Sequence, residues 1–153
     1  MKALPFLCQT NDSAAPLLAR LTLGLVMFPH GAQKALGWFG GYGYTGTMGF
    51  FTGTLHIPAV FAFLAIAAEF VGALGLIFGF LSRVAAFGIA VVMAVAILTI
   101  HSANGFFMNW AGNQKGEGIE YHLLVLGLAL IVMIYGAGKA SLDGAFTRTA
   151  KSS

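Results

Sequence analysis

Four long apolar stretches, separated by glycine-rich or polar segments, dominate the pattern of this chain. They run from about residue 14 to 36, 58 to 80, 84 to 103 and 119 to 137. At 1.5 Å of rise per residue, a helix over each stretch is about 30 Å long, which matches the hydrocarbon thickness of a bilayer. The stretches are apolar nearly all round, unlike the one-sided helices of soluble proteins. We therefore predict an all-α, integral membrane four-helix bundle that forms one domain over residues 1–153.

Composition agrees with lipid as the main solvent. The chain is 58% hydrophobic and only 8% charged, with a mean hydropathy of +0.85. A soluble domain carries about 25% charged residues. The net charge of +3 comes from scattered basic residues, so we exclude nucleic acid as a partner. Cys8 is the only cysteine, which excludes an internal disulfide. We expect Cys8 to have no specific role and the N-terminus to remain uncleaved.

The distribution of Lys and Arg predicts an orientation. With four spans, both termini and the short turn between the second and third spans share one side. That side holds Lys2, Arg83, Lys139, Arg148 and Lys151, whereas the other side holds Lys34 and Lys115. The positive-inside rule then places both termini in the cytoplasm, with Arg83 as an anchor at that surface.

The two outward loops differ from each other. Residues 37–57 are rich in glycine and aromatic residues and nearly lack charge, whereas residues 102–118 are polar and contain Trp110. The first loop fits either an aromatic belt at the headgroups or a lid over the bundle, and we expect a short helix near Thr45 to Leu55.

Glu69 is the most informative residue, because it lies in the middle of an apolar span. It follows Pro58 by eleven residues, which places it about 16 Å into the helix. A charge at that depth costs about 3 kcal/mol or more unless it is paired, protonated or facing a wet cavity. Ala65, Gly72 and Ala73 share its helix face, so we expect a neighbouring helix to approach closely and Glu69 to face the bundle interior.

Arg20 is the partner that the sequence suggests for Glu69. It shares a face of the first span with Gly24 and Gly31, which again favours close helix contact. The predicted pair either fixes helix register or forms a proton or ligand site. On the second interpretation Glu69 and Arg20 are the candidate catalytic residues.

Histidines gather at the outward ends of the spans, at positions 30, 56, 101 and 122. Three interpretations remain open: interfacial capping, a site for a quinone, or a metal or haem site. The quinone interpretation makes the ligand-binding residues His30, Lys34, His101, Glu120 and His122. No HxxxH or HExxH spacing occurs, so we assign no metal ligands.

Longer motifs point to a known family. The first span reads RLTLGLVMFPHGAQKALGWFG, the second contains Glu69 followed by GALGLIFGF, and the fourth ends in GAGKASLD. This combination resembles the DoxX family of small bacterial four-helix membrane proteins over about residues 14–143. The resemblance implies a multi-pass protein of the bacterial inner membrane. It also implies that the family pattern is carried by Arg20, His30, Lys34, Glu69 and Arg83.

The resemblance favours a redox function. Members of the family are named for a subunit of thiosulfate:quinone oxidoreductase, and others are linked to thiol and oxidative-stress defence. The leading hypothesis is a redox-associated subunit that interacts with the quinone pool or with an oxidoreductase complex. No cysteine pair, flavin motif or dinucleotide fingerprint is present, so electrons must come from a partner subunit or a bound cofactor. A non-enzymatic membrane anchor for a partner complex is the alternative, and a transporter, which would have to form a homo-oligomer, ranks last. Substrate, haem and oligomeric state stay open.

Overall fold

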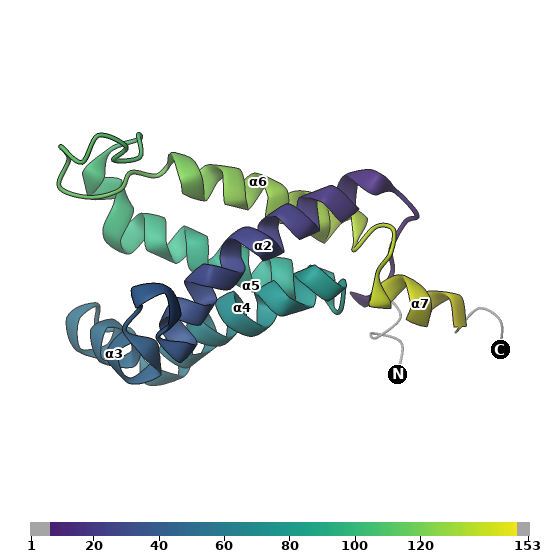
Figure 1. Ribbon diagram of the computed structural model, residues 1–153, viewed down its shortest axis with the longest axis horizontal. Coiled ribbons are helices and arrows are strands. Elements are labelled where there is room, and N and C mark those ends of the chain that lie inside the picture. The colour runs from purple at the N-terminus through teal and green to yellow at the C-terminus, as the bar shows by residue number, and fades with distance from the viewer. Residues whose placement is uncertain (1–6, 150–153) are drawn as a thin grey trace.

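The computed structural model describes residues 7–149, and these fold into helices and connecting loops without a strand. The elements keep the labels of Figure 1. Four helices form the bundle: α2 (Ala14–Leu36), α4 (Ala59–Phe78), α5 (Ser82–Ala96) and α6 (Glu120–Tyr135). The predicted all-α fold is confirmed for the described residues, and the four predicted stretches coincide with these helices to within a few residues, apart from the outward end of the third.

Shorter helical segments complete the chain. They are η1 (Trp38–Gly40), α3 (Gly43–Gly49), the π-helical η2 (Phe50–Thr54), the π-helical η3 (Ile97–His101), η4 (Ser102–Asn104) and α7 (Leu142–Thr149). Segments α3 and η2 confirm the helix expected near residues 45–55. Because η3 and η4 continue α5, the third apolar stretch is helical to residue 104, but its last turns are no longer α-helical.

Two helical segments of the described chain are long and apolar enough to cross a membrane. They are Ala59–Phe78 and the continuous segment Ser82–Asn104. The 16 residues of α6 are apolar but shorter, and the 23 residues of α2 include Arg20, His30 and Lys34. Apart from Glu69 in the middle of α4, the ionisable residues of the long helices therefore lie on α2 and at the ends of its neighbours.

Helices α2 and α4 approach each other closely because glycine faces the contact. A Cβ atom on Gly31 would lie 2.6 Å from the carbonyl oxygen of Glu69, and one on Gly24 would lie 3.0 Å from that of Ala73. The predicted small-residue contact is confirmed. It fixes the backbone of Glu69 directly against α2.

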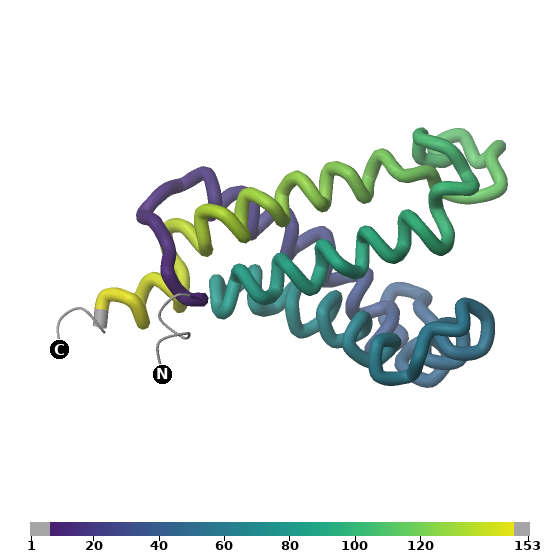
Figure 2. Tube along the Cα trace, turned by 180° about the vertical axis from the view of Figure 1, so that it is seen from behind, coloured from purple at the N-terminus to yellow at the C-terminus, as the bar shows by residue number. Residues whose placement is uncertain are grey.

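The hydrophobic core lies between the four long helices. It consists of Ala19, Leu23, Met27, Ala73, Leu76, Ala86, Ile89, Met93, Val125, Ala129 and Val132. From the tight turn at residues 79–81, α4 and α5 diverge: α4 runs towards α3, while α5 stays beside α6 and runs towards the loop at residues 105–119 (Figures 1 and 2). The bundle is thus closed at the turn and splayed at the opposite end.

Candidate functional site

The closed end of the bundle, which we call the arginine end, is built around Arg20 and the residues that follow α6. Arg20 is 1% exposed and donates five hydrogen bonds, all to main-chain carbonyls. Its Nη1 bonds Leu76 at 2.8 Å and Ile77 at 2.7 Å, and the acceptors for Nε and Nη2 are Ala137, Lys139 and Ala140. A guanidinium has five N–H groups, so every donor is used.

The predicted pairing of Arg20 with Glu69 is wrong. Glu69 lies opposite Gly31, whereas Arg20 bonds the carbonyls of Leu76 and Ile77, about two helical turns farther along α4. Residue counts along the two spans predict that the charges lie about one turn apart, whereas the observed register of α2 on α4 separates them by about two turns. Arg20 therefore completes the end of α4, where the last carbonyls lack partners within the helix.

Arg83 and Asp143 finish the arginine end in the same way. Arg83 donates to the carbonyls of Met133 and Ile134, near the end of α6. Both carboxylate oxygens of Asp143 accept from main-chain N–H groups at the start of α5, at 2.8 Å from Leu81 and 2.9 Å from Ser82. Both side chains thus form hydrogen bonds with main-chain groups at helix ends. The predicted role of Arg83 as a cytoplasmic anchor stays a prediction.

Cys8 lies buried against this end. Burial raises the pKa of its thiol above the ordinary range, and the negative charge of Asp143 raises it further. Thr147 donates from Oγ1 to the Cys8 carbonyl at 2.9 Å, which ties the N-terminal segment to α7. A buried thiol with a raised pKa is a poor nucleophile.

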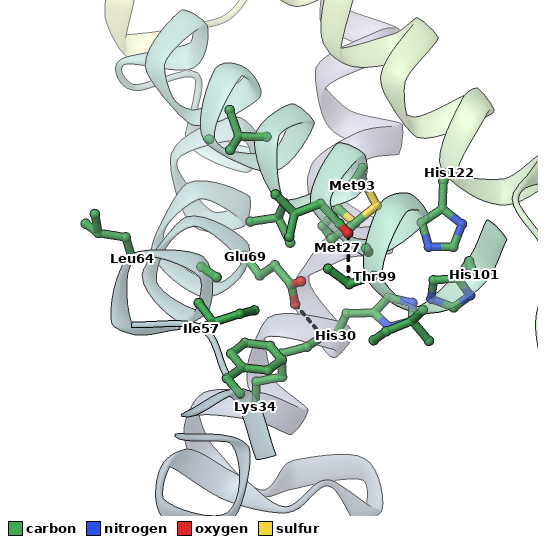
Figure 3. A pocket seen from close by; sticks show the side chains of 18 of the residues that line it. Met27, His30, Lys34, Ile57, Leu64, Glu69, Met93, Thr99, His101 and His122 are labelled. Carbon is green, nitrogen blue, oxygen red and sulfur yellow. Dashed lines mark hydrogen bonds and ion pairs between the residues drawn. The ribbon is translucent and has the colours of Figure 1, made fainter. Parts of the chain in front are cut away.

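The splayed end, which we call the histidine end, contains a cavity of about 810 Å³ between α4 and α5 that reaches α2 and α6. Its wall is formed mostly by aliphatic and phenylalanine side chains. Its polar lining residues are His30, Lys34, Glu69, Thr99, His101, Glu117, Tyr121 and His122. Arg20 and Glu120 do not line it. Figure 3 shows Glu69 in the middle of this cavity, with Leu64 on one side and His101 and His122 on the other.

An ion pair marks the deep part of the histidine end. Lys34 Nζ lies 2.5 Å from Glu69 Oε2, and the Glu69 residue is 2% exposed, whereas the Lys34 side chain is 28% exposed. Lys34 and His30 lie four residues apart on the same face of α2, so His30 shares this region. Lys34 thus gives Glu69 a partner of opposite charge inside the apolar segment, where an unpaired charge would be costly.

Two imidazole rings in contact, tilted by 45° to one another, form the other polar wall of the cavity. The ring centroids of His101 and His122 are 4.1 Å apart. The His101 Nδ1 group donates to the Glu117 carbonyl at 2.8 Å, so its Nε2 is left to accept a proton or a hydrogen bond. The Nδ1 atom of His122 is buried and makes no hydrogen bond of normal geometry, although the Gly118 carbonyl lies near it. His101 ends the π-helical η3, and such turns are frequent at functional sites.

Two of the polar residues at this end lie outside the cavity. Glu120 Oε1 accepts from the main-chain N–H of Met108 at 2.8 Å and from Trp110 Nε1 at 3.3 Å, so Glu120 orders the second loop. His56 has a positive φ of 54° and is exposed. Three of the four histidines therefore gather at the cavity.

Sequence reasoning missed Met27, Tyr121 and Glu117 as cavity residues. Tyr121 Oη donates to Met27 Sδ at 3.5 Å, and the Tyr121 ring centroid is 5.9 Å from that of His30. Met27 could have been found, because it lies seven residues before Lys34 on one face of α2. Glu117 belongs to a loop without a periodic pattern. Within residues 7–149, no group of three or more His, Cys, Asp or Glu side chains is arranged to hold a metal ion.

Comparison with known proteins gives one family and several relatives. The model of the DoxX family matches residues 15–102. The chain is 27% identical to "Putative oxidoreductase CatD" of Bacillus subtilis, over 83% of each chain. It is 29% identical to "Inner membrane protein YqjF" of Escherichia coli, over 86% of this chain and 92% of YqjF. No solved structure matches.

Proposed function

Because this chain belongs to the DoxX family and is a multi-pass protein of the bacterial inner membrane, we propose that its histidine-end cavity binds the ring of a quinone for a membrane redox complex. In this proposal all four long helices cross the bilayer as a single domain of residues 1–153, with both termini in the cytoplasm. The candidate ligand-binding residues are His30, Lys34, His101 and His122. Glu69 is the candidate proton-handling residue.

One observation carries the proposal. A cavity of about 810 Å³ inside an apolar bundle has hydrocarbon walls and a few converging polar groups, among them an acid, a base and three imidazoles. Small-molecule sites typically have about 300–1,000 Å³ and this mixture of apolar walls and placed polar groups. A quinone ring is flat and apolar, and its two carbonyl oxygens accept hydrogen bonds. The cavity offers donors for those oxygens and apolar surface for the ring.

The chemistry assigned to the site is proton transfer coupled to electron transfer. A quinone takes up two electrons and two protons to become a quinol. The electrons come from an oxidoreductase partner subunit, and the protons reach the quinone oxygens from groups that line the cavity. His101 Nε2 and the Glu69 carboxylate are the groups placed to exchange protons. The printed name of CatD supports an oxidoreductase setting.

Arg20 takes no part in this chemistry in the proposal. Its five donors are all bonded to carbonyls at the arginine end, and it does not line the cavity. We assign it a positioning role: it fixes the ends of α2 and α4, and thereby the depth at which α4 presents Glu69.

The test is quinone binding by the purified full chain in phospholipid vesicles. We expect saturable binding of a decyl-tailed benzoquinone, and a loss of about tenfold or more in Lys34→Met, because a donor to the ring oxygen is removed. Lys115→Met is the matched control, since Lys115 is exposed on the second loop and does not line the cavity. Absence of saturable binding by the wild-type chain would overturn the proposal. An absorption spectrum of the same sample, oxidised and reduced, tests for haem.

A non-enzymatic anchor is the second candidate, favoured by the exposed aromatic residues of the loops. Tyr42 is 89% exposed and Trp110 is 88% exposed, as expected of groups that meet a headgroup layer or a partner protein. Purification in mild detergent separates the two candidates. A stoichiometric partner together with a wild-type chain that binds no quinone identifies an anchor.

A further inference from the structure

The histidine-end cavity is open at the side of the bundle, between α4 and α5. Several residues that line it are largely exposed, although the same cavity reaches the buried carboxylate of Glu69. On α4 these are Phe61 and Leu64, and on α5 they are Val84, Phe87, Val91 and Val95. The cavity is therefore continuous from the flank of the bundle to the ion pair.

The shape of the bundle explains the opening. Gly72 and Gly88 bring α4 and α5 together next to the turn, with Ala85 and Ala68 as their respective neighbours. Beyond this contact the two helices separate, as both views of the chain show (Figures 1 and 2). Side chains of both helices line the space that results, and on α5 the lining continues along the outside of the contact as far as Val84, beside the turn.

The chemistry of the mouth identifies the medium that it faces. Its side chains carry no hydrogen-bonding group, and they belong to the two segments that are apolar enough to cross a membrane. An opening to water would need polar groups, since exposed apolar surface in water is unfavourable. In hydrocarbon the same side chains are at no disadvantage, so the mouth faces the acyl chains.

We propose that the opening between α4 and α5 is a lateral portal through which a membrane-soluble, tailed ligand reaches Lys34 and Glu69 directly from the bilayer. The inference rests on the proposed function and adds the route and the ligand class: a lipid-soluble quinone whose ring lies at the ion pair and whose tail leaves between α4 and α5. The lining of α5 and η3 from Val84 to Thr99 covers 16 residues, or about 22 Å of helix, which suits an extended hydrocarbon tail.

The stripe on α5 supports a tail. Lining residues recur at positions 84, 87, 88, 91, 92, 95, 96 and 99, which is one continuous face of a helix. A water-soluble ligand would use the polar groups of the cavity but not this face. The length of this apolar face therefore favours a ligand that carries a hydrocarbon tail over a ligand that consists of the ring alone.

The experiment narrows the portal and compares two quinones with the same ring. Val91→Trp places a large ring in the opening, and Val71→Trp is the matched control, because Val71 is 62% exposed on α4 and does not line the cavity. In vesicles, the binding rate of a decyl-tailed benzoquinone is measured beside that of the same benzoquinone without a tail. Far-UV circular dichroism and gel filtration verify that each variant is folded.

We expect Val91→Trp to slow binding of the tailed quinone by about tenfold or more and to leave the tail-less quinone nearly unchanged, while Val71→Trp affects neither. Unchanged binding of the tailed quinone by Val91→Trp overturns the portal and leaves the proposed function standing. Equal loss of both quinones also overturns it, because the effect would then lie at the ring site. If the wild-type chain binds neither quinone, the portal and the proposed function fall together.

Discussion

The two ends of the bundle both bury ionisable side chains but use them differently. At the arginine end, Arg20 has five donors and five acceptors, and both oxygens of Asp143 are bonded to the start of α5. At the histidine end, Glu69 has the single partner Lys34, and His122 has a buried nitrogen without one. Whether a buried charged side chain stabilises the fold or remains available for chemistry therefore depends more on how many of its hydrogen bonds are made than on its residue type.

The physical reason is the cost of a buried polar group without a partner. A guanidinium with all five donors bonded removes several such costs at once, because it supplies donors to carbonyls at the end of α4 and just after α6. A ligand-binding site, in contrast, keeps some hydrogen-bonding groups without protein partners while no ligand is bound. The comparison predicts a larger loss of stability when the guanidinium of Arg20 is removed than when the Lys34–Glu69 pair is replaced as a whole.

The largest effect should come from Arg20→Met. Removing the guanidinium takes five hydrogen bonds away from carbonyls of α4 and of residues 137–140, and we expect a loss of about 3–5 kcal/mol in the free energy of unfolding. The measurements are the yield of folded protein from membranes and its thermal unfolding in mild detergent. Arg148→Met is the control, because Arg148 is exposed and its Nε group bonds only within α7. Equal melting temperatures for the two variants would refute the assignment of Arg20.

Gly31→Ala should have the next largest effect. The added methyl group would collide with the backbone of Glu69 and Phe70, so α4 must move away, at a cost of about 1–3 kcal/mol. Quinone binding should weaken as well, because the shift displaces Glu69. Gly127→Ala is the matched control on α6: nothing lies within 4 Å of its added Cβ, and alanine favours the helix by up to about 1 kcal/mol. A Gly31→Ala variant as stable as Gly127→Ala would show that the helices do not touch there.

Asp143→Asn should cost about 1 kcal/mol, the usual value of a cap at a helix start. It also tests the environment of Cys8. Removing the negative charge should lower the raised pKa of the thiol, so that more thiolate forms at a given pH and alkylation by iodoacetamide becomes faster. In the wild-type chain, stability should fall as the pH rises above the ordinary thiol pKa, since the folded state favours the protonated form. An alkylation rate that Asp143→Asn leaves unchanged between pH 8 and 10 would contradict this contact.

The smallest change in stability is expected for the double variant Lys34→Met/Glu69→Gln. Replacing both members of a buried ion pair by neutral side chains of similar size leaves no unpaired charge, so stability should change by about 1 kcal/mol or less. Quinone binding should nevertheless fall about tenfold or more, as in Lys34→Met alone. Thermal unfolding and binding measured on one preparation check both. A large loss of stability together with unchanged quinone binding would show that the Lys34–Glu69 pair stabilises the fold and does not take part in ligand binding.

The sequence predicted the helices well and their mutual register poorly. Lipid demands long apolar helices, and this signal located α2 and α4 to within two residues of their bounds. Gly24 and Gly31 correctly predicted a close contact with α4. Depth along a span, however, was inferred from residue counts, and an error of one turn was enough to pair Glu69 with Arg20 in place of Lys34.

The remaining features of the candidate site depend on irregular backbone. The π-helical η3 brings His101 against His122, and no periodic pattern announces such a turn. The second loop places the Glu117 carbonyl next to His101, and Glu120, which the sequence favoured, serves that loop. The positions of three histidines at helix ends made it possible to predict that they lie close together. The groups to which these histidines hydrogen-bond could not be predicted in this way.

The acceptors of Arg20 also set an order of assembly. The residue belongs to the first long helix, yet three of its five acceptors lie 117 to 120 residues later in the chain. At 5–20 residues per second, synthesis of that interval takes roughly 6 to 24 seconds. Throughout this time the nascent first helix carries a cation that still lacks three of its five acceptors. Completion of the C-terminal segment is thus the event that locks the bundle, and a truncated chain would present an unsatisfied arginine to the quality-control proteases of the membrane.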